Sequence, residues 1–419
     1  MITSNAVGLD EATKPDLIVT DMTVGAQSRS ARLLDSWLLP VAAYLTLLAV
    51  MVVVSWQVTT HFTSVLKFHI SFRGDWLLGG LSHYDGGWYW LISNDGYRGH
   101  TPGMQSPVAF FPGYPLAMRY LGSVIGDNAL AGIVITALSG LGIAVLFWRW
   151  CRDRMGATAA ATSLLALLLY PYGFFLYGVI YADALFIFAT LLAFWAVERD
   201  RPLIAGLAGA VATLTRPVGI AVVLGLAVRT LERRGALKRP GWLGIPTRIQ
   251  LSAIKLKDGL VLLSISGLVA YCFFLWHKWG DPFLFSSVEK YWDQGAGPDT
   301  WFKLAFFDQV HHHADSWWTW GVVIQGLLGL TMLAFVLPVA RRFGWGYGVY
   351  LLVVVAIPLI GTKDFQGLGR YGMAAFPIFA IIGRYLAERP PALRHVVLAC
   401  SGLMLVVACA GFARGEYIT

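Results

Sequence analysis

Residues 35–56 read DSWLLPVAAYLTLLAVMVVVSW, an apolar run whose charged residue stands at its first position. A run of about 20 apolar residues is long enough to cross the hydrocarbon core of a bilayer as a helix. Similar runs recur along the 419 residues, of which 57% are hydrophobic and only 13% are charged. Soluble domains carry about a quarter charged residues. The sequence therefore predicts an all-α polytopic membrane protein.

The apolar runs predict about eleven transmembrane helices. The two runs on either side of Arg216 are too short to cross a bilayer alone, and we expect them to form a hairpin of short helices. The predicted spans are residues 35–56, 129–149, 157–173, 182–198, 203–215, 217–230, 259–277, 319–340, 346–361, 371–387 and 393–412.

The basic residues decide the predicted orientation. With the N-terminus in the cytoplasm, the Arg- and Lys-rich connections, including the basic loop 231–258, fall on the cytoplasmic side, as the positive-inside rule requires. Two long loops, 57–128 and 278–318, then lie outside, where their Trp and Tyr residues suit the membrane interface. Because the net charge of +8 is spread over the connections, we expect no nucleic-acid partner.

A single transmembrane domain, residues 35–412, is expected between two short tails. Residues 1–34 lack the basic start and apolar run of a signal peptide and are interpreted as a cytoplasmic tail. Residues 413–419 are interpreted as a short tail on the outer side. Residues 110–126 contain Arg119 and two prolines, so we interpret them as a helix along the outer interface instead of a further span.

Asp85 is the leading catalytic candidate. It lies in the first outer loop, after His83 and Tyr84 and before the run GGWYW. A carboxylate among rings near the membrane surface is partly desolvated, which favours a general base. The glycines allow a ligand to approach the backbone closely, and Trp88 and Trp90 offer stacking faces. The simpler interpretation is a solvated loop acid.

Three cations are candidates for binding phosphate. Arg216 lies at the turn of the short hairpin, where a charge at membrane depth is costly unless it meets an anion. It could instead reach toward lipid headgroups. Lys363 and Arg370, followed by Tyr371, flank the entry to a late span. The fork of a guanidinium suits phosphate oxygens, so these residues could hold a phosphorylated substrate.

Two further acids have structural interpretations as well as functional ones. Asp183 begins a predicted span, where the helix dipole favours a carboxylate, and it could lie at the edge of the same cavity. Asp281 lies in a Gly-Asp-Pro turn that turn chemistry alone explains. The consecutive His311, His312 and His313 have no partner at metal-ligand spacing. We therefore predict no metal site; a divalent cation remains compatible with the chemistry below.

Several segments resemble, in order along the chain, the sequence blocks of PIG-V-type mannosyltransferases, which are GT-C glycosyltransferases. The first and most specific is HYDGGWYWLISNDGY with SPVAFFPGYPLAMRYLG, within residues 83–122. The later ones are YADALF, LTRPVG, WGDP and GRYGMAAFPIF, within residues 181–379. Asp183 stands where that family commonly has glutamate.

The resemblance implies a GT-C fold and the transfer of a sugar, commonly mannose, from a polyprenyl-phosphate donor. It also implies that an aspartate of the first outer loop, here Asp85, acts as the base. The acceptor would be a glycolipid, a glycan or a protein, and no cofactor is required. One catalytic carboxylate suffices for this scheme. The residues expected to contact substrate are His83, Tyr84, Trp88, Tyr97, Asp183, Asp281 and Tyr371.

A transporter or flippase of a lipid-linked or small substrate is the alternative. Intramembrane ionisable residues and broken helices fit that class, which commonly shows internal repeats and polar groups near the bilayer midplane. Here the polar candidates lie at the outer ends of predicted spans, and no repeat is visible. No P-loop is present, and an enzyme facing outward has no ATP or nucleotide-sugar to use. A lipid-linked donor and a cell-membrane glycosyltransferase are therefore favoured.

Overall fold

The computed structural model describes residues 36–66, 70–238, 248–292, 294 and 297–418. The predicted tail 1–34 lies outside the described residues, as do residues 239–247 of the basic loop. In the part of the chain that the structure describes, nearly all secondary structure is helical. The sheet consists of β1 (Leu237–Lys238) and β2 (Arg248–Ile249), which pair antiparallel. The predicted all-α class is confirmed.

Among the described residues, five helices are long and apolar enough to cross a membrane, by length and composition. They are α2 (Leu38–His61), α6 (Asn128–Met155), η6 with α11 (Leu256–Ile265 and Ser266–Trp279), α15 with α16 (Trp317–Ala334 and Val336–Phe343) and α20 (Pro391–Arg414). Shorter helices complete the bundle. These are α7 (Ala157–Leu168), α8 (Asp183–Glu198), α9 (Pro202–Thr215), α10 (Ile220–Arg233), α17 (Trp345–Gly361) and α19 (Phe376–Ala387). Every predicted span corresponds to one of these helices.

Four predicted boundaries are wrong by several residues. The helices α2 and α6 continue beyond their predicted ends at residues 56 and 149 to His61 and Met155, and two other helices are shorter than predicted. The span 157–173 corresponds to α7, which ends at Leu168 because Pro171 cannot continue an α-helix. The span 371–387 corresponds to α19, which begins only at Phe376. The glycine-rich residues before it fold into two short turns, α18 (Leu368–Tyr371) and η8 (Gly372–Ala374).

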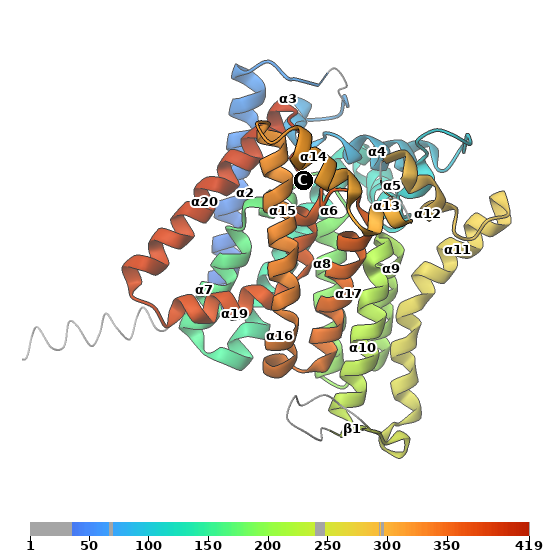
Figure 1. Cartoon of the computed structure of the whole chain (residues 1–419), viewed down its shortest axis with the longest axis vertical. Coiled ribbons are helices and arrows are strands. Elements are labelled where there is room, and N and C mark those ends of the chain that lie inside the picture. Colours follow the sequence, from blue (N-terminus) through green and yellow to red (C-terminus); the bar gives the residue numbers. More distant parts are fainter. Residues whose placement is uncertain (1–35, 67–69, 239–247, 293, 295–296, 419) are drawn as a thin grey trace, which may run out of the picture.

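The two long loops lie at the same end of the helix bundle, and β1 lies at the opposite end (Figure 1). The first loop contains α3 (Asp75–Leu78), α4 (Asp85–Asp95) and α5 (Gly113–Ile125). The second contains α12 (Leu284–Val288), η7 (Glu289–Trp292), α13 (Pro298–Trp301) and α14 (Leu304–His312). This arrangement gathers the candidate site residues at one end. Which side of the membrane that end faces stays a prediction.

Ion pairs centred on Glu198 hold the opposite end of the bundle together. The Glu198 carboxylate accepts hydrogen bonds from Arg229 Nε at 2.8 Å and from Tyr347 Oη at 3.1 Å. It also pairs with Arg154 Nη2 at 3.2 Å. These partners belong to α10, α17 and α6. One carboxylate at the end of α8 therefore connects three neighbouring helices and fixes their relative positions.

Glycines let helices of the bundle approach closely. At Gly383 in α19, an added Cβ would lie 2.2 Å from the Cα of Ser163 in α7. At Gly140 in α6, it would lie 2.4 Å from the carbonyl oxygen of Leu176. Small residues at such crossings are the usual means by which membrane helices pack backbone to backbone.

We expect Gly383→Ala to destabilise the protein, because the methyl group would push the backbones of α7 and α19 apart. Overpacking of this kind commonly costs about 1–3 kcal/mol. The measurement is thermal unfolding in detergent. Gly321→Ala in α15 is the control, because an added Cβ there meets nothing within 4 Å. Equal stability of the two variants would contradict the close approach.

Candidate functional site

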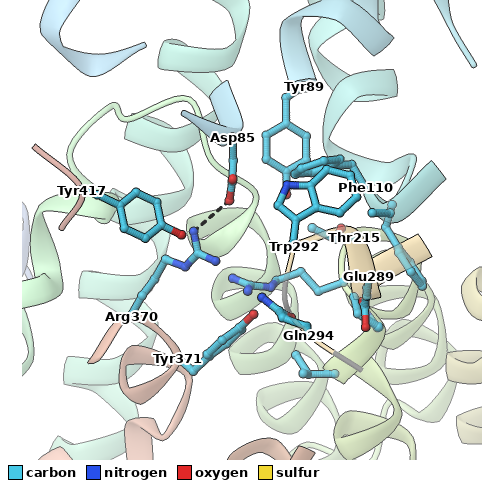
Figure 2. Close-up of a pocket in the computed structure, with 15 residues that line it drawn as sticks. Asp85, Tyr89, Phe110, Thr215, Glu289, Trp292, Gln294, Arg370, Tyr371 and Tyr417 are labelled. Carbon is cyan, nitrogen blue, oxygen red and sulfur yellow. Dashed lines mark hydrogen bonds and ion pairs between the residues drawn. The ribbon is translucent and has the colours of Figure 1, made fainter. Parts of the chain in front are cut away.

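A cavity at the loop-bearing end brings together segments that are far apart in sequence (Figure 2). Its empty volume is about 730 Å³, part of which is open to solvent. The first loop, the α9–α10 turn, the η7 segment, α18 and the C-terminal residues all contribute to its lining. The polar and aromatic residues that matter most are Asp85, Arg216, Glu289, Trp292, Arg370 and Tyr371.

Asp85 is presented to the cavity by a strained residue. It is the first residue of α4, and Tyr84 before it has a φ of 53°, a positive value that a bulky residue rarely adopts. Tyr84 is held in this conformation by two contacts. Its hydroxyl donates to the Gly415 carbonyl, and its ring meets the Tyr417 ring edge-on with centroids 5.0 Å apart. The Asp85 N–H donates to Tyr181 Oη at 3.2 Å. These contacts fix where the carboxylate points.

Two ion pairs share the site. Asp85 Oδ2 accepts a hydrogen bond from Arg370 Nη1 at 2.9 Å, and Asp183 pairs with Arg216. The ring of Tyr371 lies beside both guanidinium groups. Its centroid is 4.8 Å from Cζ of Arg216 and 5.4 Å from Cζ of Arg370. Cation–π contact and the two carboxylates together allow like charges to lie close to each other.

Arg370 stays charged and keeps a donor that Asp85 does not use. Burial disfavours the charged form, but the carboxylates of Asp183 and Asp85 outweigh this effect and raise the pKa of Arg370 above its ordinary value. Its Nε is buried and has no hydrogen-bond partner among the described residues. Because a guanidinium carries five N–H donors, Arg370 can hold Asp85 and still donate to an oxygen of a bound anion.

Glu289 is a second acid of the cavity that the sequence analysis missed. It lies in η7 and lines the cavity together with Trp292 and Gln294. Burial raises its pKa to about 7. The segment EKYWDQ places this acid among aromatic residues of an outer loop. The same type of pattern drew attention to Asp85, and it is the sequence feature that could have identified Glu289 as a candidate.

Some predicted residues support the cavity without lining it. Trp88 stacks on Phe110 with ring centroids 5.7 Å apart and meets Trp292 edge-on at 5.8 Å, so it buttresses two rings of the lining. His83 Nε2 lies 3.1 Å from the Ala413 carbonyl oxygen and connects the first loop to α20. Direct substrate contact by Trp88, His83 and Tyr84 stays a prediction.

Other predicted residues lie elsewhere. Tyr97 is buried, and its hydroxyl donates to the Phe110 carbonyl at 2.5 Å. Asp281 accepts a hydrogen bond from the Phe283 N–H at 2.8 Å, as expected for its turn. Lys363 is half-buried in the segment after α17 and does not line the cavity. Their proposed contacts with substrate or phosphate are therefore not supported by a shared cavity.

The histidine run also lies apart from the cavity. His311 and His312 belong to α14, where His312 Nδ1 lies 3.0 Å from Asp308 Oδ1. Within the described ranges, no group of three or more His, Cys, Asp or Glu side chains is arranged to hold a metal ion.

The helix arrangement is similar, at low sequence identity, to membrane proteins of known structure. Against ArnT from Cupriavidus metallidurans bound to undecaprenyl phosphate, the TM-score is 0.49 at 18% identity, over 88% of this chain and 64% of that one. Against the apo oligosaccharyltransferase of Archaeoglobus fulgidus, the TM-score is 0.42 at 13% identity, over 90% of this chain and 56% of that one. Scores below 0.5 do not by themselves show a shared fold. The chain covers less than two thirds of either protein. No protein-family model and no curated protein sequence matches the chain.

Asp183→Asn should strongly destabilise the protein, because it leaves the buried guanidinium of Arg216 without its counter-ion. The side chains of the pair are only 10% and 5% exposed, and removing one partner of such a pair costs about 3–5 kcal/mol. The control is Asp95→Asn, whose partner Arg98 is 76% exposed; it should cost less than about 1 kcal/mol. The unfolding midpoints of the two variants in detergent measure these changes in stability. Similar midpoints would show that Arg216 does not depend on Asp183.

Proposed function

We propose that this chain is an integral membrane glycosyltransferase of the GT-C type. It transfers a sugar, mannose in our proposal, from a polyprenyl-phosphate donor to an acceptor hydroxyl on the outer face of the membrane. The observation that carries the proposal is a single cavity lined by a carboxylate, Asp85, and by two guanidinium groups, Arg216 and Arg370. A base and groups that could hold a leaving phosphate thus lie together.

The phosphate of the donor would bind at the arginines. The two ion pairs together carry no net charge, so a phosphate that binds through the remaining donors of Arg370 competes with Asp85 for the positive charge of the guanidinium. Asp85 is the more accessible carboxylate, with 25% of its side chain exposed against 5% for Asp183. Phosphate at Arg370 would therefore weaken the Asp85–Arg370 pair and leave Asp85 free to act as a base.

An apolar groove whose lining includes Gly372 suits the polyprenyl chain of the donor. It has an empty volume of about 670 Å³, including open space, and its lining includes Tyr170, Met332, Gly372 and Phe379. Gly372 directly follows Tyr371, which lines the polar cavity. A lipid-linked donor needs this combination, since its tail is driven into apolar surroundings while its phosphate needs cations.

In the proposed reaction, Asp85 accepts the proton of the acceptor hydroxyl as that oxygen attacks the anomeric carbon. The new carbon–oxygen bond forms as the bond to the phosphate oxygen breaks, and the electron pair leaves with the phosphate. A single displacement of this kind inverts the anomeric configuration. The arginines stabilise the charge that grows on the leaving group. The acceptor would be a glycolipid, a glycan or a protein.

Asp85→Asn should reduce transfer by roughly 10²–10⁴-fold, the usual contribution of a general base. Purified protein in detergent is incubated with radiolabelled polyprenyl-phosphate-mannose and a membrane lipid extract, and the labelled product is counted. Asp95→Asn is the matched control, because it changes an exposed acid at the other end of the same helix. Because Asp85→Asn also removes the counter-ion of Arg370, the unfolding midpoint of each variant is measured first, and transfer is assayed at a temperature where both are folded.

Three outcomes separate the possibilities. Loss of transfer in Asp85→Asn alone supports the proposal, and the labelled product identifies the acceptor. Equal transfer by both variants would remove Asp85 from the chemistry. If the wild type moves the labelled lipid across a liposome without consuming it, the protein is a transporter and the glycosyltransferase proposal fails.

A further inference from the structure

Glu289, Trp292 and Gln294 line the cavity from one short segment of the second long loop. Figure 2 shows Glu289 and Trp292 on one side of the cavity and Asp85 with Arg370 on the other. The segment thus contributes a carboxyl group, an indole and an amide to the lining of the cavity that also contains Asp85, Arg216 and Arg370. None of these three groups takes part in the chemistry described above.

The segment is held in place from both sides. Gln294 forms an isolated antiparallel bridge with Thr362 after α17, and Lys303 Nζ donates to the Thr362 carbonyl. On the other side, Gln105 Nε2 of the first loop donates to the Tyr291 carbonyl at 3.2 Å. A binding surface needs this kind of support, because side chains position a ligand only when the backbone that carries them is fixed.

The three groups suit a sugar. An aromatic ring offers a flat apolar face to the C–H groups of a sugar ring. A carboxyl group and an amide can each donate and accept hydrogen bonds with neighbouring hydroxyls. In the proposed donor the sugar is bonded directly to the phosphate. With the phosphate at Arg370, the sugar must therefore lie in the same cavity, within reach of this segment.

Burial, and no cation among the described residues, determines the protonation of Glu289. No ion pair joins its carboxylate to any residue that the structure describes, and burial raises its pKa to about 7. Each arginine of the cavity is already paired with an aspartate. A bound phosphate would add negative charge and favour the protonated acid further. The titratable and charged groups that face the cavity with it are Asp85, Tyr89, Arg216, Arg370, Tyr371 and Tyr417.

We propose that Glu289, together with Trp292 and Gln294, recognises the sugar of the donor, and that Glu289 does so as a neutral carboxyl group that donates a hydrogen bond to a sugar hydroxyl. This inference rests on the proposed function and gives Glu289 a role in specificity, separate from proton transfer at Asp85. Donor binding should weaken as the pH rises through about 7, because ionised Glu289 loses its donor and repels the phosphate.

The test compares two radiolabelled lipids, polyprenyl phosphate and polyprenyl-phosphate-mannose, by equilibrium binding to purified protein in detergent. Glu289→Ala should weaken binding of the mannose-bearing lipid about tenfold, the size of one good hydrogen bond. Binding of the sugar-free lipid should change less than about twofold. Asp299→Asn, at an exposed acid of the same loop that does not line the cavity, should change neither.

Glu289→Gln tests the protonation state, since an amide mimics the neutral acid in size and keeps a donor. The affinity of the wild type for the mannose-bearing lipid should fall between pH 6 and pH 8.5, about tenfold per pH unit above the pKa if only the neutral form binds. That of Glu289→Gln should stay level. The phosphodiester of this lipid does not titrate in the range, so the change reports on the protein. Unfolding midpoints confirm that both variants fold.

Several results would overturn the inference. If Glu289→Ala weakened the binding of both lipids equally, Glu289 would contribute only to the charge or shape of the cavity and not to recognition of the sugar. A loss of kcat of about 100-fold in Glu289→Gln at unchanged KM would make Glu289 the base. Either result leaves the glycosyltransferase proposal standing. If the wild type binds neither lipid and transfers no sugar, the proposed function falls and this inference falls with it.

Discussion

The ion pair between Asp85 and Arg370 joins residues 285 positions apart, and the geometry of the loop-bearing end depends on it. A guanidinium that is only 11% exposed is costly to bury unless a carboxylate meets it. Arg370 therefore requires α18 to lie against the start of α4. The strained backbone at Tyr84 is tolerated because this contact and the hydrogen bond from Tyr84 to Gly415 fix it. Neutralising one buried charge thus positions the first loop over the bundle.

The need to neutralise buried charge also explains why the site contains ion pairs instead of isolated ions. Arg216 and Arg370 lie beside one tyrosine ring, and each is matched by its own aspartate. Removing any one of the four charges would leave a net charge in a poorly solvated place. On the proposed function, an entering phosphate perturbs this balance and changes the partner of Asp85. Donor binding and release of the base would then be one event.

Much of the helical frame was predictable, because a membrane span must be a long apolar run and its basic flanks are visible in the sequence. Two helices are shorter than predicted because backbone chemistry overrides hydropathy at their ends. Pro171 ends α7 early, and the glycines before Phe376 delay the start of α19. Arg216, Arg370 and Tyr371 were identified because polar residues at the ends of apolar runs are conspicuous. Asp85 was identified as an acid among aromatic residues of a long loop, and the structure places all four residues on one cavity.

For Glu289 the sequence offered only the acid-among-aromatics pattern, and its place in the cavity is set by contacts distant in sequence. Its loop contains several polar residues, and only the bridge from Gln294 to Thr362 and the bond from Gln105 to the Tyr291 carbonyl hold this segment against the cavity. Charges carried by helix ends are constrained by the membrane and can be inferred from hydropathy. Charges carried by a long loop depend on tertiary packing. If the proposed function holds, the helical frame supplies the general reaction, and loop 278–318 decides which sugar the enzyme accepts.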